Sequence, residues 1–143
     1  MPVFAINEAR TSTLGPPTVL IVDDEPAIAE TLSLILQRAG YRTIVAHSGE
    51  EAVEHAKTSP PDALVCDIVL PGIGGLETAR TIRARCPECQ IILVTGDSLN
   101  AGLPEIARSG EFELLTKPFH PEDLIEKLGK QTIVESRREM AAA

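Results

Sequence analysis

Aromatic side chains are scarce in this chain. Tryptophan is absent, and all aromatic residues together make up only 3% of the sequence. Proteins that bind single-stranded nucleic acid commonly stack the bases on aromatic rings, so we do not expect that mode of binding here. Hydrophobic residues still account for 43% of the chain. The core must therefore be built from aliphatic side chains.

Positive charge and long apolar runs are also limited. The chain carries 13 Lys and Arg residues against 21 Asp and Glu residues, which gives a formal net charge of −8. An acidic surface repels phosphate backbones and anionic lipids, which argues against direct contact with nucleic acid or membranes. The longest apolar runs, such as residues 19–22 and 91–94, are far shorter than the ~20 residues that span a bilayer.

Cysteine occurs three times, as Cys66, Cys86 and Cys89. An odd number of thiols, with no basic and then apolar start at the N-terminus, indicates a reducing cytoplasm. Cys66 lies in an apolar run and is expected to be a small core residue. Cys86 and Cys89 have the spacing of a redox pair, but a zinc site would need a second pair of ligands. We interpret this spacing as coincidental, with accidental oxidation of the two thiols as the alternative.

The histidines form no cluster with metal-ligand spacing and are expected at the surface or at helix ends: His47, His55 and His120.

Short apolar runs alternate with helix-like patterns from residue 18 onward. The apolar runs predict five strands, at residues 18–22, 41–46, 63–67, 90–95 and 112–116. The segments between and after them predict five helices, at residues 26–38, 49–57, 75–85, 99–109 and 121–131. This alternation indicates an α/β fold, in which helices cover both faces of a parallel sheet. In such a fold, ligands bind where the strands end.

The first predicted helix shows the clearest periodicity. Its apolar residues Ile28, Leu32, Ile35 and Leu36 share one face and are expected to point into the core. The second helix follows Ser48, a residue type that caps helix N-termini well.

One domain is expected, over residues 18–131, and the chain length of 143 residues fits that number. Residues 1–17 lack periodicity and end in Gly-Pro-Pro, so we expect a flexible extension or linker there. Residues 132–143 are expected to form a tail or to extend the last helix.

Polar residues follow four of the predicted strands at the edge where ligands are expected. Asp23 and Asp24 follow the first strand, Asp67 ends the third, Thr95 ends the fourth and Lys117 follows the fifth. Carboxylates crowded together favour a bound cation, and oxygen ligands suit Mg²⁺. An Asp beside Mg²⁺ and a Lys can act as a nucleophile toward a phosphoryl group.

Four motifs at these strand ends resemble those of response-regulator receiver domains. They are residues 19–26 (VLIVDDEP), 67–72 (DIVLPG), 93–96 (LVTG) and 117–119 (KPF). The resemblance extends over residues 18–131. It implies a single doubly wound, flavodoxin-like sheet of five parallel strands in the order 2-1-3-4-5, with five helices.

The resemblance also implies a role for each site residue. Asp67 would be the phosphoacceptor, while Thr95 and Lys117 would contact the phosphoryl oxygens. Mg²⁺ would be held by Asp67 and three further ligands: Asp23, Asp24 and the backbone carbonyl of Val69. The peptide bond between Lys117 and Pro118 is expected to be cis.

The partners implied by the resemblance are a sensor histidine kinase or phosphotransfer protein as phosphodonor, and a downstream protein that reads the phosphorylated state. Phosphorylation-dependent homodimerisation is a further implied contact. Such a domain catalyses only its own phosphorylation and dephosphorylation and is not otherwise an enzyme.

Two positions depart from the family pattern. Leu114 stands where many receivers carry an aromatic residue that rotates during signalling, and alternation along the strand places Phe112 on the same face as Leu114. Gly74 stands where an Asp is common, and extra glycine in this loop would increase its mobility. Without the aromatic residue, we expect backbone displacement near residues 96–104 to carry the signal.

Three alternatives remain open. The chain could be a receiver excised from a hybrid histidine kinase or from a longer response regulator. It could be a phosphorylation-independent interaction module. It could also be a phosphatase with an aspartyl nucleophile, although such enzymes carry a second Asp two residues after the first, where this chain has Val69, or Glu25 if Asp23 is the nucleophile.

Overall fold

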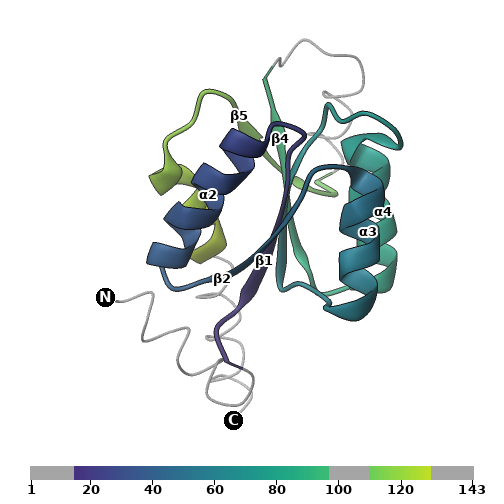
Figure 1. Ribbon diagram of the computed structural model, residues 1–143, viewed down its shortest axis with the longest axis horizontal. Coiled ribbons are helices and arrows are strands. Elements are labelled where there is room, and N and C mark those ends of the chain that lie inside the picture. Colours follow the sequence, from purple (N-terminus) through teal and green to yellow (C-terminus); the bar gives the residue numbers. More distant parts are fainter. Residues whose placement is uncertain (1–14, 97–109, 130–143) are drawn as a thin grey trace.

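Five parallel strands form one sheet through the middle of the molecule (Figure 1). The computed structural model describes residues 15–96 and 110–129. The strands are β1 (Thr18–Val22), β2 (Arg42–Ala46), β3 (Ala63–Asp67), β4 (Gln90–Thr95) and β5 (Glu113–Thr116). Their order is β2-β1-β3-β4-β5, and every neighbouring pair is parallel. The predicted fold class, strand number and strand order are confirmed.

Helices cover both faces of this sheet. They are α2 (Pro26–Arg38), α3 (Gly49–Thr58), α4 (Gly74–Arg85) and a helix at residues 121–129. In Figure 1, α2 and the helix at 121–129 lie on one face, while α3 and α4 lie on the other. Four of the five predicted helices are thus present in the described ranges, whereas the helix predicted at 99–109 lies outside them, as do residues 130 and 131. None of the helices in those ranges is both long and apolar enough to cross a membrane.

Most element boundaries match the predicted ones to within a residue, and two strands begin one residue later than expected. The backbone N–H of Tyr41 donates to the carbonyl of Leu36 at 3.0 Å, so Tyr41 belongs to the turn that closes α2. Gly40, with φ of +102°, makes that turn. Phe112 follows a second turn at Gly110, where φ is +65°, and β5 pairing begins only after it.

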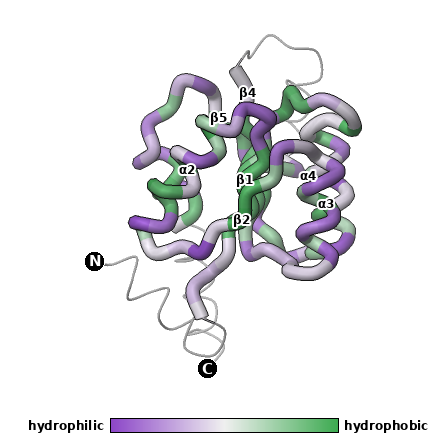
Figure 2. Tube along the Cα trace, viewed as in Figure 1, coloured by the Kyte–Doolittle hydropathy of each residue, from purple (hydrophilic) through white to green (hydrophobic). Residues whose placement is uncertain are grey.

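The sheet divides the aliphatic core into two layers. Alternate residues of β1 point to opposite faces: Leu20 and Val22 pack beneath α3 and α4, whereas Val19 and Ile21 pack beneath α2. Figure 2 shows the strands in the hydrophobic colour and much of the outer surface of α3 and α4 in the hydrophilic one. Because both faces are covered, nearly continuous apolar strands are stable here.

The inward face of α2 differs from the predicted one. Of the four apolar residues expected in the core, only Leu36 is buried, together with Ala29 and Ser33. Small side chains at Ala29 and Ser33 let the helix lie close to the sheet, and the Ser33 hydroxyl lies 2.6 Å from the Thr43 hydroxyl of β2. The remaining three apolar residues are half-buried, and of these Leu32 still packs against the core as expected: Ile28, Leu32 and Ile35.

Candidate functional site

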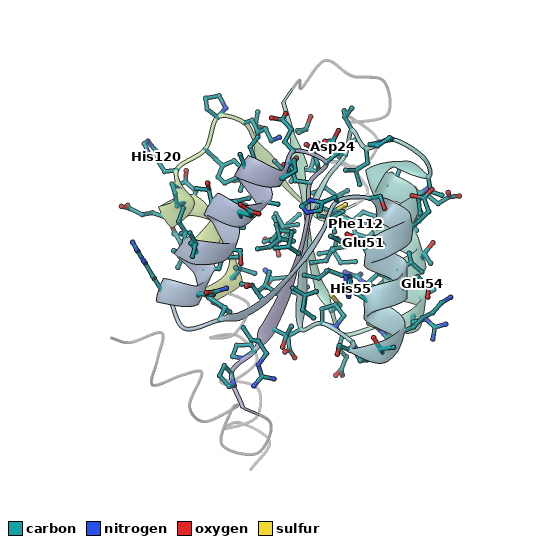
Figure 3. The ribbon with its side chains drawn as sticks, viewed as in Figure 1. Asp24, Glu51, Glu54, His55, Phe112 and His120 are labelled. Carbon is teal, nitrogen blue, oxygen red and sulfur yellow. The ribbon has the colours of Figure 1, made fainter. Side chains whose placement is uncertain are left out.

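Three carboxylates meet where the parallel strands end. Asp23 directly follows β1, Asp67 is the last residue of the adjacent strand β3, and Asp24 lies where β1 leads into α2 (Figure 3). One carboxylate oxygen from each residue lies within 4.8 Å of the other two. The sheet order therefore brings the predicted acidic residues together.

Backbone amides fix two of these carboxylates in place. The N–H of Glu25 donates to Oδ1 of Asp23 at 2.9 Å, and the N–H of Val69 donates to Oδ1 of Asp67 at 3.0 Å. Asp23 is only 4% exposed and Asp67 only 8% exposed, whereas Asp24 is exposed. Buried carboxylates need such donors, because an unpaired charge away from water is costly.

Lys117 supplies the positive charge of the site. Its Nζ lies 2.9 Å from Oδ2 of Asp67 and 3.7 Å from Oδ2 of Asp23. Burial acts to lower the pKa of this ammonium, but the hydrogen bond and charge of Asp67, with the charges of Asp23 and Glu25, outweigh burial and raise the pKa. The bond from Lys117 to Pro118 is cis, as expected.

The donor set fits a hard divalent cation. Three carboxylates lie together, and the one ammonium beside them pairs with Asp67 and Asp23, so the cluster retains excess negative charge. Carboxylate oxygens are the ligands that Mg²⁺ prefers, and Mg²⁺ usually binds through one or two of them while keeping several waters. The exposed side of the cluster, at Asp24, leaves access for such a hydrated ion.

Comparison with known proteins identifies the family. A family model described as the response regulator receiver domain matches residues 19–129. This chain belongs to the response regulator receiver family. The receiver resembles the probable transcriptional regulatory protein TcrX of Mycobacterium tuberculosis, with 33% identity over 114 residues, covering 79% of this chain and 48% of the relative. It also resembles the response regulator MprA of Mycobacterium ulcerans, with 37% identity over 114 residues, covering 77% of this chain and 47% of the relative.

The receiver thus spans about half the length of the curated relatives it matches. Solved structures are matched almost completely. A CheY-like receiver domain protein from Methanospirillum hungatei aligns with a TM-score of 0.78 and 26% identity, over 87% of this chain and 99% of that one. TrrA from Thermotoga maritima, solved in complex with Mg²⁺-BeF, aligns with a TM-score of 0.70 and 36% identity, over 80% of this chain and 98% of that one.

The two remaining predicted site residues of the receiver also lie at this edge of the sheet. Thr95 ends β4, is 2% exposed, and accepts the backbone N–H of Lys117 on its carbonyl at 2.7 Å. Val69 is 63% exposed, and its described contact is made by its amide. The contact of Thr95 with a phosphoryl group and the binding of metal by the Val69 carbonyl stay predictions.

Backbone conformation and steric contact, and not only mobility, explain why glycine occurs in the loop after β3. Gly72 and Gly74 have φ of +78° and +75°, a region that side chains disfavour. Gly75 lies so close to Asp67 that a Cβ there would overlap the Asp67 carbonyl. The missing side chain at Gly75 therefore lets α4 begin directly beside the predicted phosphoacceptor.

Sequence reasoning missed the position of His47. This exposed residue directly follows β2, and its Nδ1 lies 3.2 Å from the backbone carbonyl of Asp23. The backbone N–H of His47 donates to the Glu51 carboxylate at 2.7 Å, while the Ser48 hydroxyl accepts the Glu51 N–H at 3.1 Å, which confirms Ser48 as the cap of α3. The expected strand order could have predicted this position, because His47 follows β2, Asp23 follows β1, and these two strands are neighbours.

The cysteines of the receiver are separate from this chemistry. All three are free and buried, and Cys66 is a core residue as expected. Cys86 follows α4 and Cys89 precedes β4, at the opposite end of the sheet. Burial raises the pKa of Cys86, and it raises the pKa of Cys89 to about 12. Thiols with such pKa values form little thiolate, which favours a coincidental spacing.

Proposed function

We propose that this receiver accepts a phosphoryl group on Asp67 from a sensor histidine kinase or a phosphotransfer protein, and that the phosphorylated form signals through altered protein–protein contacts. The observation that carries the proposal is the position of the Asp67 carboxylate. It lies 2.9 Å from the Lys117 ammonium and within 4.8 Å of the carboxylates of Asp23 and Asp24.

Each site residue has a separate role in the phosphoryl transfer. A carboxylate oxygen of Asp67 attacks phosphorus as the bond from phosphorus to the donor nitrogen breaks, and the freed imidazole nitrogen of the donor takes up a proton. Lys117 neutralises charge on the phosphoryl oxygens, and the Thr95 hydroxyl donates to one of them. Asp23, Asp24, Asp67 and the Val69 carbonyl would hold Mg²⁺, which would further neutralise that charge.

Other parts of the proposal rest on the family and on composition. A cytoplasmic location fits reduced, buried thiols. The curated relatives extend well beyond the matched region, which supports the alternative that this receiver is one module of a longer response regulator or hybrid kinase. In either setting, the domain catalyses only its own phosphorylation and dephosphorylation.

The decisive experiment is phosphorylation by a small acyl phosphate in the presence of Mg²⁺, followed by intact-mass measurement. We expect one phosphate adduct on the native chain and none on Asp67→Asn. Asp62→Asn is the matched control, because Asp62 precedes the same strand at its other end; this variant should be phosphorylated normally. An undiminished adduct on Asp67→Asn would refute the assignment.

A further inference from the structure

A cavity of about 330 Å³ opens beside the acidic cluster, between α2 and the segment that leads into the helix at 121–129. Ligand pockets in proteins typically measure ~300–1,000 Å³ and have mostly apolar walls with a few polar groups, and this cavity fits both criteria. Its walls include the three half-buried residues of α2, namely Ile28, Leu32 and Ile35.

The apolar part of the cavity extends across two structural layers. Phe119 and Pro121 form the wall opposite α2, and Val65 and Val94 of the sheet contribute to its floor. Phe119 is half-buried, so its ring still has surface to offer a ligand. Leu32 and Phe119 also pack against the core beneath α2, so the cavity adjoins the core and its apolar walls are held in place by it.

Three charged residues line the polar end of the cavity: Asp23, Asp67 and Lys117. The Lys117 ammonium is already shared by Asp67 at 2.9 Å and Asp23 at 3.7 Å. Two carboxylates and one ammonium therefore line this end, and Asp24, which is in the same carboxylate cluster but does not line the cavity, adds further negative charge nearby. A cationic group at this end gains attraction that an anionic group does not, and the partly buried setting makes the difference larger than in water.

We infer that this cavity binds a small amphipathic cation, with an apolar body between α2 and Phe119 and a protonated amine at Asp23. The amine would occupy the space beside the carboxylates that are expected to hold Mg²⁺, so the two cations would compete. Binding in the cavity does not require phosphoryl transfer, so it can be measured whether or not Asp67 is phosphorylated.

Phenylbutylamine is a suitable probe, and phenylbutanoate is its charge-reversed counterpart. Titration of the full chain, followed by NMR amide shifts, should show saturable changes at α2, at Asp23 and around Phe119. We expect phenylbutanoate to bind at least about tenfold more weakly, and saturating Mg²⁺ to weaken phenylbutylamine by a similar factor. Equal binding of the two probes, or shifts that avoid these residues, would overturn the inference, as would no binding at millimolar concentration.

Variants that fill the cavity test its location. Leu32→Trp should reduce phenylbutylamine affinity at least about tenfold by occupying the space of the apolar body. Leu34→Trp is the matched control, because Leu34 is on the same helix but 57% exposed and outside the cavity; it should leave the affinity unchanged. Ile35→Phe provides a milder filling if Leu32→Trp does not fold. Unchanged affinity in a folded filled variant contradicts the inference.

One competing occupant is the chain's own C-terminal segment, residues 130–143, which carries Arg137 and Arg138. Replacement of both arginines by Glu in the full chain distinguishes this segment from a small amphipathic cation as the occupant of the cavity. If the cavity receives a small molecule, phenylbutylamine affinity stays the same. If affinity rises at least about tenfold, the segment normally occupies the cavity, and our inference is wrong.

Discussion

Asp24 is the member of the acidic cluster with most contact to solvent, and its charge adds repulsion that no ion pair within residues 15–96 and 110–129 offsets. Replacing it by Asn removes that repulsion, so we expect the free energy of unfolding in metal-free buffer to rise by about 0.5–1 kcal/mol. The same change should weaken Mg²⁺ binding, because it removes a proposed ligand. Urea denaturation and Mg²⁺ titration would measure the two effects, and a loss of stability with unchanged metal affinity would contradict the prediction.

Phosphorylation of Asp67 is expected to require a divalent metal. Like charges from Asp23 and Asp24 repel an incoming phosphoryl group unless a cation offsets them. Chelation of divalent metal should therefore abolish the phosphate adduct detected by intact mass, and added Mg²⁺ should restore it. If phosphorylation persists in excess chelator, the proposed metal assistance is wrong.

Cys89 gives a prediction on pH dependence. Burial raises its pKa from the ordinary 9.0 to about 12. Above pH 9.0 the unfolded thiol therefore loses its proton while the folded one keeps it. The unfolded state then binds fewer protons, so the free energy of unfolding falls as pH rises, by up to about 1.4 kcal/mol per pH unit for each thiol.

Urea denaturation at several alkaline pH values gives the free energy of unfolding as a function of pH. The test compares the slope of this dependence between the native protein and Cys89→Ala. The variant should show a shallower slope by roughly 1 kcal/mol per pH unit. Ser59→Ala, an exposed position without a titrating group, should keep the native slope. Equal slopes in native protein and Cys89→Ala would show that burial does not shift this thiol.

Among the elements, α4 depends on a close approach to β3. A Cβ at Gly75 would overlap the Asp67 carbonyl and crowd the Cα of Ile68. Gly75→Ala should therefore push α4 away from the end of β3 and lower the free energy of unfolding by about 1–3 kcal/mol. Gly96→Ala is the control, since a Cβ there meets no atom within 4 Å. Urea denaturation would measure both, and similar stability in the two variants would contradict the packing argument.

The molecule as a whole must transmit phosphorylation from Asp67 to a surface. Leu114 and Phe112 pack in one hydrophobic cluster, as strand alternation predicted, and Leu114 has no ring to rotate. We therefore still expect the backbone near residues 96–104 to carry the signal, although residues 97–109 lie outside the described ranges.

Hydrogen exchange with and without a phosphoryl mimic tests this route. We expect protection to change at residues 96–110, and less at α2 and α3. Asp67→Asn, treated with the same mimic, is the control and should show no change. Changes confined to α2 or α3 in the native protein would contradict the route.

Much of the fold followed from local patterns. The continuous apolar runs of β1, β3 and β4 predicted buried parallel strands, because only a sheet covered on both faces hides such runs from water. The first residues of β2 and β5 were predicted less well, because a turn precedes each strand. A backbone hydrogen bond at Tyr41 and the φ angle of Gly110 before Phe112 decide where strand pairing starts.

The sequence by itself determined the strand runs and the kinds of residue that follow them. The motif resemblance added the strand order and a role for each of Asp23, Asp24, Asp67, Thr95 and Lys117. Only the grouping of these residues followed from physical reasoning, because parallel strands gather their ends along one edge; the strand order and the roles came from the resemblance alone.

Only the tertiary structure decided which face of α2 is buried, how His47 approaches Asp23, and that a cavity adjoins the cluster. Periodicity assigns apolar residues to one side of a helix, but the distance to the sheet depends on small residues such as Ala29 and Ser33. The space left between α2 and Phe119 depends on how two elements far apart in the chain pack together, and no local pattern records that distance.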